Sequence, residues 1–383
     1  MSARAVLSRL KPFGYAAASY GRRALANLGL APKRPPVGIV IERADWAIRW
    51  WGEFTVEQAN RLAPGTAWTT TDPAALTSGV AQFGSQFQWV DWSPYVSAHC
   101  RWVTTYFHGR YEDGPHMARH IDGFLASVPK LDRIVASAMI VRDRLLGWGV
   151  PAEKINVIPI GCETDRFVAP TPEQRAQQRA RFGIQSHEIV IGSFQKDGDG
   201  WGAGDVPKLI KGPDLFLAAI EQLAKDVPVF VLLGGPARGY VRMGLERIGV
   251  RHAHHYAPNR DELAKLYHAL DLYLVTSREE GGPMALMESM SSGVPVVSTR
   301  VGMAPDLIAD GVSGALVNVE DVSALVRKAS GILSLADGGI CLKRAARDAV
   351  MQTDWSVVGR RHLDEVWRPL LAQAKAANGR SIA

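Results

Sequence analysis

Cysteine is scarce in this sequence of 383 residues, with Cys100, Cys162 and Cys341 lying far apart. Such spacing matches neither a disulfide framework nor a metal site, and it fits a reducing cytoplasm. The sequence also lacks an apolar run long enough to cross a bilayer, a low-complexity tract, and the h-region and cleavage site of a signal peptide. These absences predict a globular, cytoplasmic protein, and a chain of this length predicts two domains.

Acidic residues are absent from the first 36 positions, which carry seven basic residues. Removing these seven charges from the net charge of +6 leaves the remainder of the chain at −1. A nucleic-acid-binding protein more often has a basic face on its folded body, so we expect no nucleic-acid partner. One interpretation of this basic arm is an interfacial helix on an anionic membrane surface. The alternatives are a helix packed on the body and a disordered tail.

Beyond the arm, short apolar runs alternate with amphipathic stretches. Strands are predicted at 37–41, 101–107, 133–137, 154–159, 189–193, 229–233 and 272–275, and helices at 139–148, 214–224 and 262–270. Two such series predict an α/β fold with two doubly wound parallel sheets. The predicted division is a basic arm (1–36), an N-terminal domain (37–168), a connection (169–187), a C-terminal domain (188–350) and a helical segment that returns to the N-terminal domain (351–383).

The stretch SREEGGPMALMESMSSGVPVVS, residues 277–298, places Glu280 and Glu288 around a Gly-Gly-Pro turn at the start of an apolar helix. Pro283 suits the first helical position, and Gly293 ends the helix before a strand. The free N–H groups at such a helix start suit a phosphate. Because helical side chains lean toward the N-terminus, both carboxylates flank this amide-rich pocket, which suits a nucleotide sugar. The alternative is that the acids only favour the helix dipole.

A second segment, residues 191–214, combines a glycine-rich loop with three lysines. Its glycines allow close backbone approach, and Lys196 and Lys211 could meet a diphosphate, whereas Lys208 fits an ordinary exposed loop better. The same loop contains Asp197 and Asp199, a spacing that can hold a divalent metal. The pair is short and common by chance, so we predict no metal there.

In this order, the motifs resemble those of the retaining glycosyltransferases of family GT4. The resemblance spans roughly residues 100–320, is strongest over 280–288 and 292–297, and continues through Gly302, Asp306, Gly311 and Gly314, with support from His108-Gly109, residues 157–161 and Lys211-Gly212. It implies the GT-B fold, with two Rossmann-like domains facing a central cleft. It also implies transfer of a hexose-type sugar, with retention, from a UDP-sugar or GDP-sugar donor to an acceptor hydroxyl, with no metal or other cofactor. The acceptor would be a glycan or a lipid-linked molecule.

The resemblance further implies roles for individual residues. Glu280 would bind hydroxyls of the transferred sugar, and Glu288 would bind the ribose. Lys211 would neutralise the departing diphosphate, and His108 would touch the donor sugar from the opposite domain. His108, Lys211 and Glu280 form the predicted catalytic set. The donor-binding set comprises Gly192, Ser193, Lys196, Lys211, Gly234, Tyr256, Glu280, Gly281, Gly282, Met284, Ala285 and Glu288, with the amides around Met284 and Ala285 holding the distal phosphate.

Several positions depart from the family pattern. Ser193 stands where the family usually has an arginine, and Lys196 is the candidate substitute. The usual Glu-Gly-Phe-Gly turn is Glu-Gly-Gly-Pro, and the glycine pair after the first strand is replaced by ERADWAIRWWG, residues 42–52. We predict acceptor binding by Arg43, Asp45 and Trp46, although the tryptophans of this stretch fit a core better.

A histidine-rich stretch, His252, His254 and His255, precedes Tyr256 near the place where the family holds the nucleotide base. Base contact by Tyr256 is the interpretation kept here, and metal binding by the histidines is not expected. Two other functions stay open: another GT-B enzyme, such as a nucleotide-sugar epimerase or a sugar phosphorylase, and a non-catalytic nucleotide-sugar binding protein. A dehydrogenase is disfavoured because no G-x-G-x-x-G follows the first strand.

Overall fold

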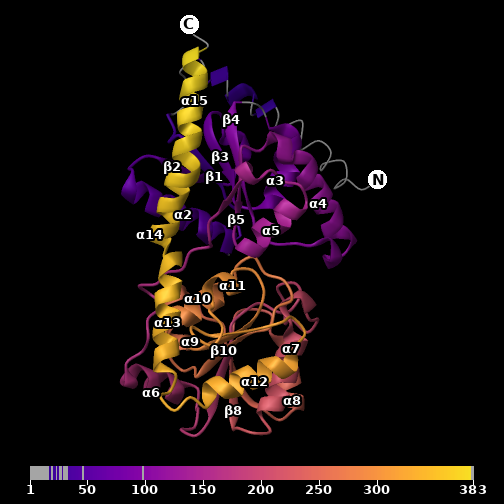
Figure 1. The fold of residues 1–383 in the computed structure, drawn as a ribbon, viewed down its shortest axis with the longest axis vertical. Coiled ribbons are helices and arrows are strands. Elements are labelled where there is room, and N and C mark those ends of the chain that lie inside the picture. The colour runs from indigo at the N-terminus through magenta and orange to yellow at the C-terminus, as the bar shows by residue number, and fades with distance from the viewer. Residues whose placement is uncertain are drawn as a thin grey trace. The chain divides into compact units, whose positions relative to one another are not determined.

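The computed structural model describes residues 17–18, 20–22, 24–25, 28, 33–44, 47–96 and 99–380. The chain forms two compact units, which are described separately (Figure 1). The first comprises Met1–Ile160 and Trp355–Ala383, and the second comprises Gly161–Asp354. Most of the basic arm, with its proposed membrane contact, lies outside the described residues. Within the described ranges, no helix is long and apolar enough to cross a membrane.

The first unit contains a six-stranded parallel sheet in the order β2-β1-β3-β4-β5-β6. Its strands are β1 (Val37–Val40), β2 (Ala67–Thr70), β3 (Gly79–Phe83), β4 (Cys100–Tyr106), β5 (Arg133–Ala136) and β6 (Ile155–Val157). Its α-helices are α2 (Ala47–Leu62), α3 (Gln86–Trp92), α4 (Pro115–Ser127), α5 (Met139–Gly147), α14 (Trp355–Arg361) and α15 (Arg368–Arg380), with a π-helix η8 (His362–Trp367) between the last two. Short 3₁₀ turns are η1 (Pro73–Ala75), η2 (Ser93–Tyr95), η3 (Tyr111–Asp113), η4 (Val128–Lys130) and η5 (Ala152–Lys154).

The second unit contains another six-stranded parallel sheet, in the order β12-β11-β10-β7-β8-β9. Its strands are β7 (Ile189–Ser193), β8 (Val229–Gly234), β9 (Arg251–His255), β10 (Leu272–Val275), β11 (Val296–Thr299) and β12 (Ala315–Val317). Its helices are α6 (Pro172–Arg181), α7 (Pro213–Leu223), α8 (Gly239–Arg247), α9 (Arg260–Tyr267), α10 (Met284–Ser291), α11 (Ala304–Leu307), α12 (Val322–Leu333) and α13 (Ile340–Val350), with 3₁₀ turns η6 (Leu209–Lys211) and η7 (Met351–Thr353).

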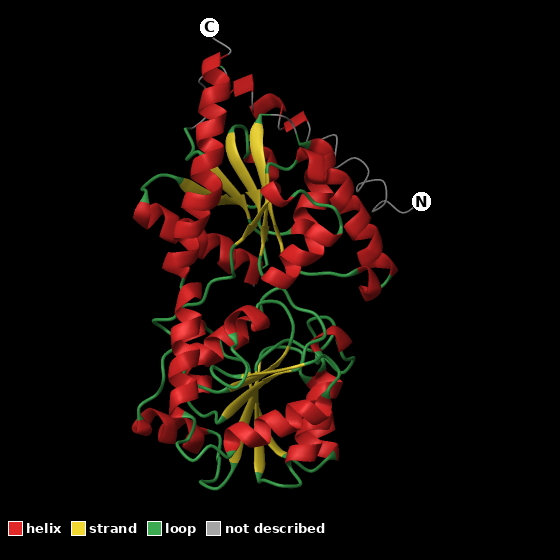
Figure 2. Ribbon diagram, viewed as in Figure 1, coloured by secondary structure: helices red, strands yellow, loops and turns green. Residues whose placement is uncertain are grey.

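Helices surround the sheet in each unit (Figure 2). The predicted fold class, two doubly wound parallel α/β sheets, is therefore confirmed. The strand order reverses between β7 and β10 in the second unit, and between β1 and β3 in the first. Ligands of such sheets bind outside the carboxyl ends of the strands at this reversal. The loops after β7 and β10 are therefore the first place to look for a site in the second unit.

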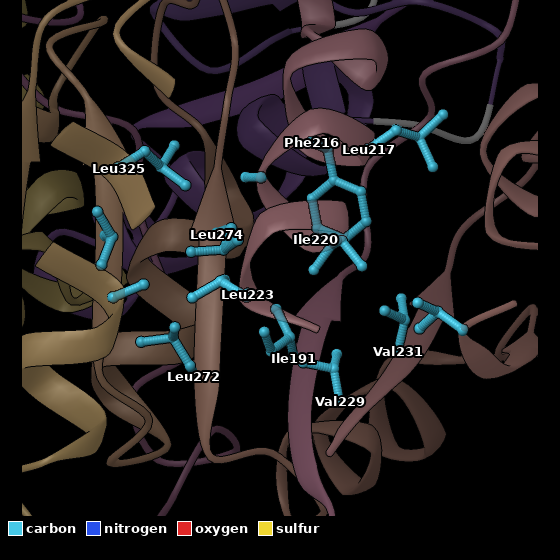
Figure 3. Packing of buried hydrophobic residues seen from close by; sticks show 14 of the residues in the cluster. Ile191, Phe216, Leu217, Ile220, Leu223, Val229, Val231, Leu272, Leu274 and Leu325 are labelled. Carbon is cyan, nitrogen blue, oxygen red and sulfur yellow. The ribbon is translucent and has the colours of Figure 1, made fainter. Parts of the chain in front are cut away.

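The strands of the second unit are apolar because helices cover the sheet that they form. Figure 3 shows Phe216 and Ile220 of α7 packed with Ile191, Val231 and Leu274 of the sheet, and all five side chains are at most 1% exposed. Burying one such side chain contributes about 1.5–3 kcal/mol, so this cluster is a main source of stability for the second unit. It also fixes the strand ends that carry the loops.

Several elements match their predicted positions closely. The bounds of β7 and β10 are those expected, and the other predicted strands differ by one or two residues at one or both ends. Within the stretch predicted as a connection, residues 172–181 form α6, whose Arg175 and Arg179 pair with Asp271 at 2.5 and 3.1 Å. The two compact units do not test the predicted domain boundaries, which remain predictions from the sequence.

His362 lies in the π-helix of the first unit and is completely buried. Its ring lies between those of Trp51 and Trp367, with centroids 5.4 and 5.6 Å away. Neither ring nitrogen has a hydrogen-bond partner among the described residues. Burial, reinforced by the charge of Arg361, lowers the pKa of His362 to about 3. The imidazole is therefore neutral in the folded protein.

We expect His362→Phe to flatten the acid limb of the stability curve. In the unfolded chain a histidine titrates near pH 6.5, so below that pH the unfolded state binds a proton that the folded state does not. Stability is then lost as pH falls from about 6.5 towards 3, by up to about 1.4 kcal/mol per pH unit. Denaturant unfolding of wild type and variant between pH 7 and 4.5 measures this slope. Parallel pH dependences would contradict it.

Candidate active site

The turn between β10 and α10 lies at the strand-order reversal of the second unit. Helix α10 begins at Met284, and Pro283 before it offers no side-chain cap. The Leu286 N–H donates to the Pro283 carbonyl at 3.0 Å, whereas the N–H groups of Met284 and Ala285 have no acceptor within the helix. Gly302, with φ +47°, backs this turn, since a Cβ there would lie 2.8 Å from the Glu280 carbonyl oxygen and 2.7 Å from that of Gly281. The result is an open helix start on a fixed turn.

Glu280 and Lys211 meet at this turn. Lys211 Nζ lies 2.6 Å from Glu280 Oε2, with side-chain exposures of 24% and 9%. The other carboxylate oxygen, Oε1, accepts a 2.9 Å hydrogen bond from Ser277 Oγ. The Lys211 carbonyl accepts a 2.9 Å bond from the Gln195 side chain. The two residues predicted from separate motifs are thus joined in one half-buried ion pair.

The backbone fixes this meeting. Gly212 has φ +64°, and a Cβ there would collide with the carbonyl oxygen of Thr276. Thr276 Oγ1 in turn donates to the Gly212 carbonyl at 2.8 Å, and the Arg278 N–H donates to the Ile210 carbonyl at 2.8 Å. A glycine after Lys211 is therefore required so that the loops following β7 and β10 can touch.

Positive charge gathers around the pair. The pKa of Lys208 is lowered, first by burial and then by the charges of Lys211 and Lys196, while Glu280 opposes the shift. Lys208 thus lies near both Lys211 and Lys196, and this positive charge near an open helix start suits an anion with more than one charge. The structure therefore brings together Lys196, Lys211 and Glu280 of the predicted donor-binding set.

Glu288 lies on α10 and is buried, with both carboxylate oxygens engaged. Arg260 Nη2 donates to Oε1 at 3.0 Å, and the Tyr267 hydroxyl donates to Oε2 at 2.8 Å. Arg260 also pairs with Glu163. A carboxylate has about four lone-pair positions, so Glu288 can still accept a hydroxyl from a ligand. Sequence reasoning missed Arg260 and Tyr267, because neither lies in a motif that predicts a partner for Glu288.

Arg238 is a third residue that sequence reasoning missed, and its side chain is fully buried. Its Nε donates to Asp197 Oδ1 at 2.9 Å, its Nη1 to the Ser193 and Gly234 carbonyls at 2.5 and 2.6 Å, and its Nη2 to Ser193 Oγ at 3.0 Å. The guanidinium thus stands beside Ser193, where the family pattern leads one to expect an arginine side chain. Asp197 is thus engaged in a buried ion pair with Arg238. Among the described residues, no cluster of three or more side chains could hold a metal ion.

Other predicted residues of the second unit lie apart from this ion pair. Gly192 and Gly234 belong to β7 and β8, where a Cβ would press on Leu270 and Phe194, so packing alone accounts for both glycines. Tyr256, after β9, is 64% exposed. The three histidines before it have different partners: His252 contacts the Val250 carbonyl just before the strand, His254 the Gly235 carbonyl at 2.8 Å, and His255 the Arg181 side chain.

The remaining predicted residues belong to the first unit. His108 follows β4, and its carbonyl accepts a 2.9 Å bond from Gln86. It neighbours His120, whose pKa is lowered to about 4 by burial and by the charges of His116 and His108. Arg43 follows β1 and is exposed. The predicted acceptor residues Asp45 and Trp46 lie outside the described residues.

Comparison with known proteins places this site in a family. Residues 203–334, which include Lys211, Glu280 and Glu288, match the family described as glycosyl transferases group 1. The chain is similar to this family over these residues of the second unit. The GT4 resemblance inferred from the motifs is therefore confirmed.

Curated proteins similar to this chain include two kinds of glycosyltransferase. The chain is 28% identical over 242 residues to D-inositol 3-phosphate glycosyltransferase of Mycobacterium sp. (strain KMS), covering 61% of this chain and 52% of that protein. It is also 28% identical over 240 residues, 59% of this chain and 58% of the relative, to a GDP-mannose-dependent alpha-(1-6)-phosphatidylinositol monomannoside mannosyltransferase of Mycolicibacterium smegmatis. The chain thus spans about half the length of the curated relatives it matches.

Solved structures share the fold of this chain over most of its length. HepE of Anabaena in complex with UDP aligns with a TM-score of 0.69 at 14% identity, covering 86% of this chain and 98% of HepE. WaaG, a glycosyltransferase involved in lipopolysaccharide biosynthesis, aligns with a TM-score of 0.61 at 16% identity, covering 86% and 99%. The GT-B fold expected from the sequence is therefore confirmed.

Proposed function

We propose that this protein transfers a hexose-type sugar, with retention, from a nucleoside-diphosphate sugar to an acceptor hydroxyl. The observation that carries the proposal is the Lys211–Glu280 pair at the open start of α10. Lys211 would stabilise negative charge on the departing diphosphate, and the α10 amides would bind its distal phosphate. Glu280, freed from part of its contact with Lys211, would accept hydrogen bonds from the sugar hydroxyls.

The remaining roles follow from the neighbouring strands. Glu288, oriented by Arg260 and Tyr267, would hold the ribose hydroxyls, and Tyr256 would contact the base. His108 would contribute from the first unit, and Arg43, Asp45 and Trp46 would bind acceptor. With no nucleophile among the assigned residues, we favour front-face attack, in which the leaving phosphate helps to remove the acceptor proton. Retention and independence of metal are expectations from the family resemblance.

The acceptor class we propose is a glycan or a lipid-linked molecule. Support comes from the names of the relatives, which act on inositol 3-phosphate and on phosphatidylinositol monomannoside. The basic arm of residues 1–36 would then bring the enzyme to an anionic membrane surface on the cytoplasmic side.

A thermal-shift panel tests the proposal. UDP, GDP, UDP-glucose and GDP-mannose are each added to the full chain in EDTA, since a ligand of the native state raises its melting temperature. At least one nucleotide should stabilise the protein, and the matching sugar donor should yield free nucleoside diphosphate when acceptor glycans or glycolipids are supplied. Intact donor after long incubation with many acceptors would favour a binding protein, and no stabilisation by any nucleotide would overturn the proposal.

Glu280→Gln and Glu288→Gln are expected to show that the two carboxylates bind different parts of the donor. Glu288→Gln should lower the affinity for the bare nucleoside diphosphate and for the sugar donor alike. The expected loss is roughly tenfold, the scale of one hydrogen bond to a charged group. Glu280→Gln should leave the affinity for the bare nucleotide unchanged and lower the rate of sugar transfer. Calorimetry with UDP or GDP on both variants measures the difference, and equal losses for the bare nucleotide would refute this division.

A further inference from the structure

The chain between β7 and η6 forms a short hairpin, residues 197–208, named here the tryptophan hairpin. Its two arms are joined by backbone hydrogen bonds: the Asp199 N–H donates to the Val206 carbonyl at 2.9 Å, and the Lys208 N–H donates to the Asp197 carbonyl at 2.7 Å. A bridge between Gly198 and Pro207 completes the pairing. The hairpin is therefore an ordered element at the carboxyl end of the sheet.

The hairpin is attached firmly to the body of the second unit. The N–H groups of Gly239 and Tyr240, at the start of α8, donate to the carbonyls of Ala203 and Gly204 at 2.8 and 2.9 Å. Gly204 lies so close to Ala237 that a Cβ would collide with its backbone. At the base, the buried Arg238–Asp197 pair ties the first arm to the ends of β7 and β8. Attachments at both places hold the tip in position.

This fixed tip presents Trp201 to solvent, with 64% of the residue exposed. Lys196 Nζ lies 4.2 Å from the centroid of the Trp201 ring, which is cation–π distance. An indole is the largest apolar side chain, and leaving it in water on an ordered loop forgoes the free energy of its burial. Trp201 and Lys196 together offer a ligand an exposed aromatic face with a hydrogen-bond donor beside it.

Lys196 connects the indole to the anion site. It stands close enough to Lys208 to lower the pKa of that lysine, as Lys211 also does. The Lys211 side chain contacts Glu280 at 2.6 Å. The tryptophan therefore borders the lysine group rather than standing on a distant surface.

We propose that Trp201 and Lys196 form a subsite for a pyranose ring of a substrate bound at this mouth. The apolar C–H face of a pyranose packs on the indole, and Lys196 donates to a hydroxyl or phosphate oxygen at the ring edge. The ring comes either from the donor sugar or from the acceptor. This inference rests on the proposed function and assigns a sugar-contacting role to a residue outside the motifs that carry the family resemblance.

Trp201→Ala in the full chain tests the subsite, with two matched controls. Trp201→Phe keeps an aromatic face, and Val206→Ala removes another 64%-exposed apolar side chain from the same hairpin. Calorimetry compares UDP with UDP-glucose and GDP with GDP-mannose for each protein. A second arm uses saturation-transfer NMR with methyl α-D-glucopyranoside and methyl α-D-mannopyranoside, each in the presence of UDP or GDP.

If the subsite binds the donor sugar, Trp201→Ala should lower the affinity for the sugar nucleotide about tenfold more than the affinity for the bare nucleotide. This is the scale of one buried apolar contact. An acceptor-side subsite predicts unchanged donor affinity and loss of the glycoside signal. In both cases the two controls should resemble wild type. If wild type binds nucleotide and Trp201→Ala matches it in both arms, the subsite is refuted while the proposed function stands. If wild type binds no nucleotide, both fail.

Discussion

Arg238→Leu is expected to destabilise the second unit by about 3–5 kcal/mol, the usual cost of removing one partner of a buried ion pair. The substitution leaves the carboxylate of Asp197 in a site where it is only 1% exposed. It also removes the donors for the Ser193 and Gly234 carbonyls. The pKa of Asp197 is already raised by burial, against the opposing effect of Arg238. Without the guanidinium, we expect this carboxyl to take up a proton on folding at neutral pH.

Urea unfolding measures the loss. Adding Asp197→Asn to Arg238→Leu should recover part of the stability, because no buried charge then remains. Arg181→Leu is the matched control, since Arg181 pairs with Glu262 at 3.0 Å with 37% of its side chain exposed, and it should cost less than about 1 kcal/mol. A loss for Arg238→Leu no larger than for Arg181→Leu would show that the buried pair contributes little.

Lys211→Ala should lower kcat by about 10²–10³-fold, which corresponds to roughly 2.7–4 kcal/mol of lost transition-state stabilisation. Lys211 is the lysine in direct contact with Glu280, and the charge on the leaving diphosphate grows as the glycosidic bond breaks. Because Lys211 is partly exposed and Ser277 still donates to Glu280, the loss of folding stability should be much smaller.

Steady-state kinetics with the donor found in the thermal-shift panel measure this effect. Lys211→Arg, which keeps the charge, should lie between wild type and Lys211→Ala. Lys208→Ala should have a smaller effect, and Lys225→Ala, on a remote part of the unit, should have none. Turnover at the wild-type rate in Lys211→Ala would rule out the electrostatic role, and a matching fall in melting temperature would indicate a structural one.

Local patterns predicted the second unit well because its chemistry follows its strands. Each useful pattern is only a few residues long: the apolar runs at β7 and β10, the Lys211-Gly212 pair and the Gly-Gly-Pro turn. The side chains that complete the site come from distant parts of the sequence and belong to no such local pattern. Arg238 reaches Ser193 from 45 positions away, and Arg260 reaches Glu288 from 28 positions away, so only the folded sheet brings them together. The sequence analysis gave no range for β2 and β3 of the first unit or for β9 and β12 of the second, because these strands lack the longer continuous apolar runs of the predicted strands.

The first unit is made of two separate stretches of chain, and this discontinuity sets an order for folding during synthesis. The indole of Trp367 donates to Gln82 Oε1 at 2.7 Å across 285 positions, so the last helices complete a core begun by the earliest strands. The second unit, residues 161–354, is continuous, and all of it is synthesised before Trp367 is added to the chain. Domains that are complete fold first as synthesis proceeds. The N-terminal sheet therefore lacks the indole that contacts Gln82 until the C-terminal helices have been synthesised and have left the ribosome.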